Sequence, residues 1–214
     1  MQRVTAKICG LSTSETVAAA VRGGASYVGF VFFPKSPRNI EAEQARMLSQ
    51  DVPHHIGKVA VLVDPDDDLI DQAVRVAGVD ILQLHGDESP ERMAALRGRY
   101  PAIGLWKAIP VRARADLRAS KPYADIADLI LYDAKTPAGT LPGGMGLRFD
   151  WSLLEGFEHA ARWALSGGID VNNVDRAVAI AAARLIDVSS GVESVPGIKD
   201  VDKIAAFLQR IASL

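Results

Sequence analysis

Eight short runs of mainly Val, Ile and Leu recur along the chain at nearly regular intervals. The starts of successive runs lie 22 to 34 residues apart, and most are close to 25. An interval of this size accommodates one buried strand, one helix and two short loops. The pattern therefore predicts eight strands, which start at Val4, Tyr27, Lys58, Asp80, Gly104, Asp128, Arg162 and Leu185.

The segments between these runs carry signals for the start and the end of helices. Residues 12–14 precede an Ala-rich stretch that two glycines end, and Ser89-Pro90-Glu91 opens another helix with an acidic first turn. Further helices are predicted for LIDQAVRVAG, VDRAVAIAAA and the amphipathic DVDKIAAFLQRIA. The exception follows the sixth strand: residues 136–146 are rich in Gly and Pro, and only a short helix at residues 151–154 is predicted. We interpret this segment as a functional loop, with a plain flexible insertion as the alternative.

Eight strand–helix repeats without a break in composition predict an α/β fold with a parallel sheet. The count of eight favours closure into a (β/α)8, or TIM, barrel, and 214 residues lie near the lower limit of about 200 for that fold. We therefore predict one (β/α)8-barrel catalytic domain over residues 1–214, with a sixth helix that is short or replaced by the Gly/Pro-rich loop. An open doubly wound nucleotide-binding sheet is the weaker alternative, because no G-x-G-x-x-G follows the first strand.

Polar side chains occur late in several of the predicted strands. They are Lys7 and Cys9 in the first strand, Gln83 and His85 in the fourth, Lys107 in the fifth, Asp133 in the sixth, and Asp187 and Ser189 in the eighth. Alternate residues of a barrel strand face inward, and active sites of such barrels lie at the carboxyl ends of the strands. Because buried charge is costly unless it is paired, these side chains are expected to converge on one mouth of the barrel for a function.

Two lysines are placed to pair with two of these acids. Closure makes the first and eighth strands neighbours, so Lys7 is expected to pair with Asp187, and Lys107 is expected to lie near Asp133. Each pair can be structural, or the lysines can raise the local positive potential and favour a thiolate at Cys9. A lone cysteine is more often a small buried apolar residue, but the position of Cys9 at a strand end beside Lys7 favours catalysis.

Two glycine-containing turns follow the seventh and eighth strands, where barrels of this kind usually bind phosphate. They are Gly167-Gly168 and Ser189-Ser190-Gly191. Glycines let the backbone approach a ligand closely, and free N–H groups bind the dianion. The alternative is that these are simple turn glycines. Arg38 in FPKSPRN is either a solvated loop charge or a ligand-binding residue on the same mouth, and His85 is either a hydrogen-bonded scaffold residue or part of the pocket.

The composition excludes several classes of protein. Hydrophobic residues make up 49% and charged residues 23%, with a formal net charge of −2 and no Lys/Arg cluster, so we expect no nucleic-acid partner. The single cysteine excludes an intrachain disulfide and a multi-cysteine metal site. No stretch approaches the roughly 18 apolar residues that cross a bilayer, and the first residues lack an apolar signal core. We expect a cytoplasmic protein with no membrane partner.

These residues also lie in blocks that resemble the phosphoribosylanthranilate isomerase family over essentially the whole chain. The blocks are KICGL at Lys7, GFVFFPKSPR at Gly29, LQLHG at Leu82, LYDA at Leu131, GGMGLRFDW at Gly143, LSGGI at Leu165 and IDVSSGVES at Ile186, followed by PG one residue later. Each block alone is suggestive, whereas their order and spacing together are highly specific.

The resemblance implies the reaction and the residues that perform it. An aminoaldose, N-(5-phosphoribosyl)anthranilate, is converted to an aminoketose by an Amadori rearrangement in tryptophan biosynthesis, without metal or organic cofactor. Cys9 matches the general base that takes the C2′ proton, and Asp133 matches the general acid that protonates the furanose oxygen. Arg38 matches the residue that holds the anthranilate carboxylate, while Asp187 is expected at the ribose hydroxyls. The turns around Gly168 and Ser190-Gly191 match the phosphate site.

One position departs from the family pattern, and two rival functions stay open. Met145 stands in GGMG where a small hydroxyl residue is expected, which puts in doubt a hydroxyl contact from that loop. One rival is another phosphosugar aminoaldose isomerase on the same barrel, although the histidine-pathway family pairs two aspartates where this chain has Cys9 and Asp133. The other is a barrel that binds the phosphosugar without catalysis. The expected ligand is a small molecule with phosphate and carboxylate groups, bound by a monomer or a homodimer.

Overall fold

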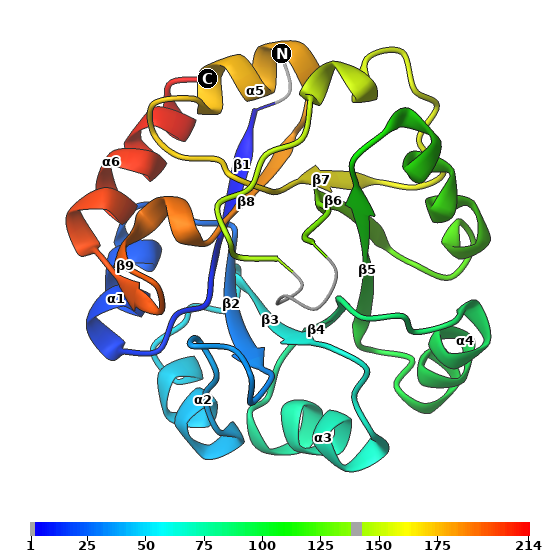
Figure 1. Cartoon of the computed structure of the whole chain (residues 1–214). Helices are drawn as coiled ribbons and strands as arrows, with labels where there is room; N and C mark the ends of the chain where they lie inside the picture. Colours follow the sequence, from blue (N-terminus) through cyan, green and yellow to red (C-terminus); the bar gives the residue numbers. More distant parts are fainter. Residues whose placement is uncertain (1–2, 138–142) are drawn as a thin grey trace.

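The fold is a closed barrel of eight parallel strands. The computed structural model describes residues 3–137 and 143–214. Its strands are hydrogen-bonded in the order in which they occur in the chain, and the last pairs with the first (Figure 1). They are β1 (Thr5–Cys9), β2 (Tyr27–Phe32), β3 (Gly57–Leu62), β4 (Ile81–Leu84), β5 (Gly104–Val111), β6 (Leu129–Ala134), β7 (Trp163–Leu165) and β8 (Leu185–Val188). This arrangement confirms the predicted (β/α)8 barrel.

Helices surround the barrel and connect successive strands. They are α1 (Ser14–Arg22), α2 (Ala42–Ser49), α3 (Asp67–Asp71) continued by a π-helical turn (Gln72–Val76), α4 (Pro90–Arg99), the 3-10 helices Arg114–Tyr123, Trp151–Leu154 and Ser190–Val192, α5 (Val174–Ala181) and α6 (Val201–Ala212). Between β6 and β7 the described chain forms only the short 3-10 helix, which confirms the prediction of a short sixth helix. The described part of the predicted functional loop is residues 136–137 and 143–146; its other residues lie outside the described ranges.

Local sequence explains where several helices begin. The Thr13 hydroxyl accepts a hydrogen bond from the Thr16 N–H at the start of α1, and the Ser89 hydroxyl does the same for Arg92 at the start of α4. Two helical segments were not predicted. Helix α2 begins after Glu41, an N-cap residue that makes no side-chain capping bond, and the 3-10 helix Arg114–Tyr123 contains a proline near its end. Both lack the signals on which the prediction relied.

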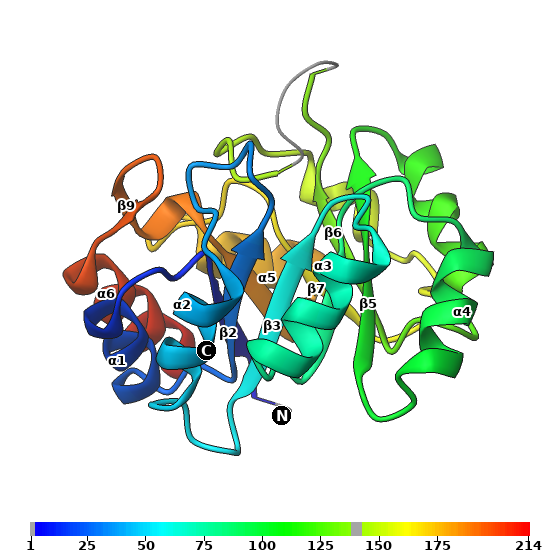
Figure 2. The same ribbon diagram turned by 90° about the horizontal axis from the view of Figure 1, so that it is seen from below.

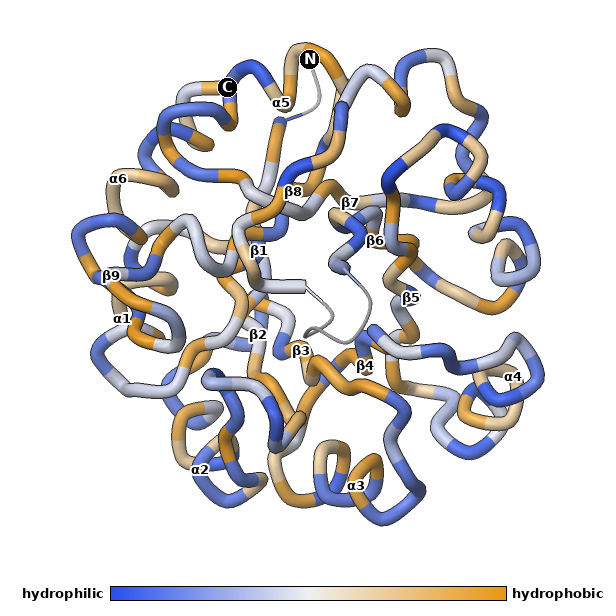
Figure 3. The backbone as a smooth tube through the Cα atoms, in the orientation of Figure 1, coloured by the Kyte–Doolittle hydropathy of each residue, from blue (hydrophilic) through white to orange (hydrophobic). Residues whose placement is uncertain are grey.

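The core lies in two places. The larger part fills the space between strands and helices, and a smaller cluster fills the barrel interior with Val59, Trp106, Leu129, Leu131 and Leu185. The tube coloured by hydropathy shows apolar residues gathered along the strands, with mostly hydrophilic connecting loops (Figure 3). The carboxyl ends of β2, β3 and β5 point to the same side of the barrel (Figure 2). The apolar interior therefore leaves one mouth for polar side chains.

A two-stranded hairpin that the sequence did not predict follows β8. Strands β9 (Glu193–Val195) and β10 (Ile198–Lys199) pair antiparallel just before α6. At the turn, a Cβ on Gly197 would lie 2.6 Å from the carbonyl oxygen of Pro37, so the hairpin packs closely against the loop that follows β2. This contact brings Glu193 and Lys199 to the mouth of the barrel. No helix in the described ranges is long and apolar enough to span a membrane.

Candidate active site

The polar residues singled out in the sequence meet at one mouth of the barrel. A cavity of about 550 Å³ is lined by Cys9, Arg38, His85, Asp133 and Asp187. A second, smaller cavity shares Asp133 and Asp187 with the first and extends over the turns after β7 and β8, where Gly167, Gly168, Ser189 and Ser190 line it. The two cavities together form one site. Cys9 and the two aspartates lie at its centre, Arg38 lies at one end, and the glycine-containing turns lie at the other. Gly191 lines neither cavity.

Lys7 and Asp187 form a buried ion pair inside the barrel, as the sequence predicted. The register of β1 and β8 places the two residues side by side, and Lys7 Nζ donates to Asp187 Oδ1 at 2.9 Å. Burial alone would lower the pKa of Lys7, but the Asp187 carboxylate and, to a smaller extent, the contact with Cys9 outweigh burial and raise that pKa above its ordinary value. Lys7 therefore carries its positive charge beside Asp187 and Cys9, two residues that line the cavity.

The surroundings of Cys9 favour the thiol over the thiolate. Burial raises the pKa of Cys9 above its ordinary value; Lys7 lowers it in part, while the Asp187 carboxylate raises it again. Lys7 therefore favours the Cys9 thiolate, as expected, but its effect is smaller than that of burial, and the pKa of Cys9 stays above its ordinary value. The main physical reason is the loss of water around the buried sulfur, and the Asp187 carboxylate adds to it by offsetting the charge of Lys7.

The Asp133 carboxyl group is held by the His85 ring and by the backbone N–H of the next residue, Ala134. His85 Nε2 lies 3.1 Å from Asp133 Oδ2, and the N–H of Ala134 donates to Asp133 Oδ1 at 2.9 Å. On its other side, His85 Nδ1 lies 3.2 Å from the side-chain amide of Gln83. His85 is thus both a hydrogen-bonded residue and a lining residue of the cavity.

Lys107 does not lie near Asp133 as an ion-pair partner, and that prediction is wrong. Lys107 Nζ donates to Glu88 Oε2 at 2.9 Å and to the carbonyl oxygen of Gly86 at 2.6 Å. The two charged side chains are both 3% exposed. The sequence reasoning considered strand residues only, whereas the partner of Lys107 comes from the loop after β4.

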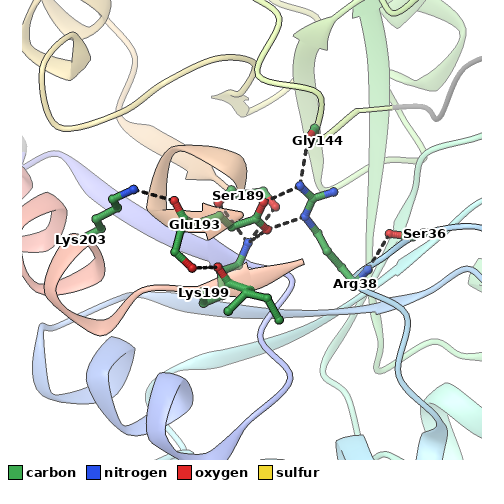
Figure 4. Close-up of polar contacts among 9 residues, drawn as sticks. Ser36, Arg38, Gly144, Ser189, Glu193, Lys199 and Lys203 are labelled. Atoms are coloured by element: carbon green, nitrogen blue, oxygen red, sulfur yellow. Dashed lines mark hydrogen bonds and ion pairs between the residues drawn. The ribbon is translucent and has the colours of Figure 1, made fainter. Parts of the chain in front are cut away.

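Arg38 is held by two residues that the sequence reasoning did not single out (Figure 4). Its Nε and Nη2 donate to the two carboxylate oxygens of Glu193, each at 2.7 Å, and Nη2 also donates to the carbonyl oxygen of Gly144 at 2.9 Å. Lys199 Nζ donates to Glu193 Oε1 at 2.6 Å. Burial alone would raise the pKa of Glu193, but Arg38 and Lys199 bring it below its ordinary value. A Glu followed by a Lys six positions later was visible, but the hairpin that brings both to Arg38 was not.

The glycines of the two turns occupy positions that no side chain fits. A Cβ on Gly168 would lie 2.2 Å from Arg148 Cγ, at a positive φ of 61°, and one on Gly191 would lie 2.0 Å from the carbonyl oxygen of Ile169. Gly191 therefore shapes the turn from behind, where it packs against the loop after β7, and Gly168 and Ser190 face the cavity. The turn glycines are required by packing whether or not they bind phosphate.

The sequence of this chain matches one protein family over almost its whole length. The family model described as N-(5′-phosphoribosyl)anthranilate (PRA) isomerase matches residues 6–210. The N-(5′-phosphoribosyl)anthranilate isomerase of Zymomonas mobilis subsp. pomaceae is 54% identical over 211 residues, which cover 99% of each chain. The chain belongs to the phosphoribosylanthranilate isomerase family.

Solved structures of this family have the same fold. One is a phosphoribosyl anthranilate isomerase in complex with reduced 1-(o-carboxyphenylamino)-1-deoxyribulose 5-phosphate; it is 34% identical, with a TM-score of 0.85, and the match covers 99% of this chain and 100% of that one. Another, a monomer form of the dimeric enzyme from Thermotoga maritima, is 36% identical with a TM-score of 0.84 and the same coverage. As a phosphoribosylanthranilate isomerase, the chain is an enzyme of tryptophan biosynthesis, which confirms the predicted function over its two rivals.

The cavity of this isomerase also has an apolar wall that the sequence reasoning did not single out. Val31, Phe33, Val61 and Val63 line the cavity beside Arg38. A flat ring with a carboxylate has this combination of surfaces, apolar faces and one anionic edge. Met145, the residue that departs from the family pattern, is 47% exposed and lines the smaller cavity. Its thioether offers no hydroxyl donor there.

Proposed function

We propose that the chain converts N-(5′-phosphoribosyl)anthranilate into 1-(2-carboxyphenylamino)-1-deoxyribulose 5-phosphate, with Cys9 as the general base and Asp133 as the general acid. The observation that carries the proposal is that both residues line one cavity, between Arg38 and the glycine turns. A proton donor and a proton acceptor on one substrate are what an aldose–ketose rearrangement requires. The family relative solved with a reduced product bound supports a ligand that bears phosphate and carboxylate.

Three groups of residues hold the substrate in this proposal. Arg38 binds the anthranilate carboxylate, with the ring against the apolar wall of Val31 and Phe33. The phosphate lies in the turns of Gly167, Gly168 and Ser190, whose conformation Gly191 makes possible. Asp187 accepts hydrogen bonds from ribose hydroxyls, and His85 binds and orients beside Asp133. The reacting carbon atoms then lie between Cys9 and Asp133.

The first step opens the sugar ring. The Asp133 carboxyl donates its proton to the furanose oxygen as the bond between that oxygen and C1′ breaks. The lone pair of the anthranilate nitrogen forms a double bond to C1′, so the product is an iminium cation. His85, at 3.1 Å from Asp133 Oδ2, holds the carboxyl toward the cavity.

The second step removes the proton on C2′. The Cys9 thiolate takes this proton, and the electron pair of the C–H bond moves toward the iminium nitrogen to give an enolamine. A proton added at C1′ and one lost from the C2′ hydroxyl give the ketone, so atoms and electrons balance without an external oxidant or reductant. Because burial raises the pKa of Cys9, the iminium cation has a second role: its positive charge next to the thiol favours the thiolate when it is needed.

The test is the loss of anthranilate fluorescence when freshly made substrate is mixed with purified protein. Cys9→Ala and Asp133→Asn are each expected to lower kcat by about 10²–10⁴-fold while they largely spare KM, because each removes one proton transfer. Glu43→Gln, at an exposed helix position, is the control and keeps wild-type kcat. Arg38→Ala is expected to raise KM instead. Wild-type kcat in either Cys9→Ala or Asp133→Asn would refute the assigned roles, and absence of turnover by the wild type would refute the reaction.

Three further features stay predictions from the sequence. They are the organisation of residues 1–214 as one catalytic domain, the cytoplasmic location, and the choice between a monomer and a homodimer. The rearrangement consists of proton transfers that side chains can perform, and this supports the expectation that the reaction needs neither metal nor organic cofactor.

A further inference from the structure

The contacts around Arg38 assign a role to two residues beyond those already placed in the reaction. We propose that Glu193, held in turn by Lys199, is a positioning residue that orients Arg38 toward the substrate carboxylate and links it to the phosphate turn. The proposal rests on the proposed function of Arg38 and the turn after β8. It explains how Arg38, at the carboxylate end of the substrate site, and the turn after β8, at the phosphate end, are kept at a fixed separation.

The geometry leaves Arg38 only one free edge. Nε and Nη2 are occupied by the two oxygens of Glu193, and Nη2 also by the carbonyl oxygen of Gly144 (Figure 4). A paired fork of this kind fixes the plane of the guanidinium, not just its distance. Nη1 has no hydrogen-bond partner among residues 3–137 and 143–214. It is the donor that Glu193 leaves for an anion in the cavity.

The packing agrees with a fixed arginine. A Cβ on Gly10 would lie 2.8 Å from Arg38 Cδ, and a Cβ on Gly144 would lie 2.5 Å from Arg38 Nη1. Two glycines thus make room for the stem and the head of the side chain. Arg38, Glu193 and Lys199 are at most 7% exposed in their side chains, so water competes little for these hydrogen bonds.

Lys199 connects the arginine clamp to the phosphate turn. Its Nζ donates to Glu193 Oε1 at 2.6 Å and also to the carbonyl and hydroxyl oxygens of Ser189, at 3.0 and 3.1 Å. Ser189 immediately precedes the Ser190-Gly191 turn. A single ammonium group therefore touches both the residue that holds Arg38 and the backbone that leads into the phosphate site.

The charges of this cluster call for an anionic ligand. Arg38 and Lys199 contribute two positive charges and Glu193 one negative charge, so one positive charge is uncompensated among these three buried side chains. A substrate carboxylate at Nη1 would balance it. The excess charge also allows the role of geometry to be separated from the role of charge, because the two make opposite predictions for Glu193.

The experiment compares Glu193→Gln with Glu193→Asp. The Gln variant adds one net positive charge to the cluster, and the Asp variant keeps the charge but shortens the side chain by one methylene. If Glu193 positions Arg38, both variants raise KM by about tenfold and change kcat by less than about threefold, because the loss is in substrate binding. If charge alone mattered, KM would fall in the Gln variant and stay unchanged in the Asp variant, and the proposal would be overturned.

A double-mutant cycle separates positioning from general support of the fold. In the Arg38→Ala background, Glu193→Gln is expected to add no further increase in KM, because it acts through Arg38. Independent, additive increases would overturn the proposal. Lys199→Met is expected to raise the inhibition constant of inorganic phosphate, because Lys199 contacts the residue that leads into the phosphate turn. Glu193→Asp is the control and is expected to leave this constant unchanged. An unchanged constant in Lys199→Met would overturn the proposed link between Arg38 and the turn. If Glu193→Gln does not fold, Glu193→Asp takes its place in the cycle.

Calorimetry keeps this test independent of turnover. The probe is reduced 1-(o-carboxyphenylamino)-1-deoxyribulose 5-phosphate, which carries both anionic groups. Weaker binding to Glu193→Asp than to the wild type supports the positioning role, whether or not the wild type turns over the substrate. Failure of the wild type to turn over the substrate would refute the reaction and not the positioning role. Equal binding to both proteins would overturn the positioning role while the reaction stands.

Discussion

Replacement of Lys7 by Met is expected to destabilise the barrel strongly. The Lys7 side chain is fully buried, and its Nζ lies 2.9 Å from Asp187 Oδ1 in a side chain that is 5% exposed. Met fills a similar volume but leaves the Asp187 carboxylate without its cation. Removal of one partner of a buried ion pair typically costs about 3–5 kcal/mol, because the remaining charge stays away from water.

This cost converts into a large change in the melting temperature. For a chain of this length, 1 kcal/mol corresponds to about 2–4 °C in Tm, so the expected decrease is about 6–20 °C. The pKa of Lys7 is raised in the folded protein, since Asp187 and Cys9 outweigh the lowering effect of burial. A group whose pKa is raised by folding contributes fully to the free energy of unfolding at any pH below its unfolded pKa, which is about 10.4 for lysine. This contribution is lost only as the pH rises through the raised, folded pKa. The contribution of the Lys7 charge is therefore expected to be the same at pH 6 and pH 9.

Thermal unfolding followed by circular dichroism measures this change, with two comparison variants. Lys7→Met combined with Asp187→Leu removes both charges and is expected to recover most of the lost Tm, because an apolar pair of similar volume carries no desolvation cost. Arg46→Met breaks an exposed pair with Glu43 and is expected to lower Tm by less than about 4 °C. A Tm for Lys7→Met within about 2 °C of the wild type, or a double variant less stable than the single one, would refute the reasoning.

Three more predictions follow from the same geometry. Because burial raises the pKa of Cys9, the pH midpoint of its alkylation by iodoacetamide is expected to lie above that of the unfolded chain, and kcat/KM is expected to rise over the same pH range. Cys9 is the single cysteine, so the measured alkylation belongs to it alone. A midpoint at or below that of the unfolded chain would contradict the prediction. Lys107→Met leaves the Glu88 carboxylate buried without its cation, so Tm is expected to fall by about 6–20 °C. The pH midpoint of Cys9 alkylation is expected to stay at its wild-type value, and a shifted midpoint would show that Lys107 acts on the thiol. Gly191→Ala places a methyl carbon 2.0 Å from the Ile169 carbonyl oxygen, a clash that displaces the turn. The inhibition constant of inorganic phosphate is therefore expected to rise by at least about tenfold, and an unchanged constant in a folded variant would separate this turn from phosphate binding.

Much of the barrel followed from local patterns. The eight strands lie within a few residues of their predicted starts, because each is a short apolar run with its own turn signals. Parity along the strands placed Cys9, His85, Asp133 and Asp187 around one cavity, and closure of the sheet was enough to pair Lys7 with Asp187. These features depend on period and strand order, which a sequence contains.

Other features depended on contacts between segments that are distant in sequence. Lys107 binds Glu88 rather than Asp133 because a loop folds back over the strand end, and no strand periodicity reports that loop. Glu193 and Lys199 reach Arg38 because a hairpin packs on the loop after β2, although 155 residues separate Glu193 from Arg38.

The direction of the pKa shift of Cys9 was also a tertiary property. The sequence indicated a lysine beside a cysteine, which favours a thiolate. The folded barrel adds the loss of water around the sulfur and an aspartate that neutralises the lysine, and the sum raises the pKa instead. The sequence by itself determined which groups are present and on which face of a strand each lies. Their distances and their exposure to water set the electrostatic balance, and only the tertiary structure decided those.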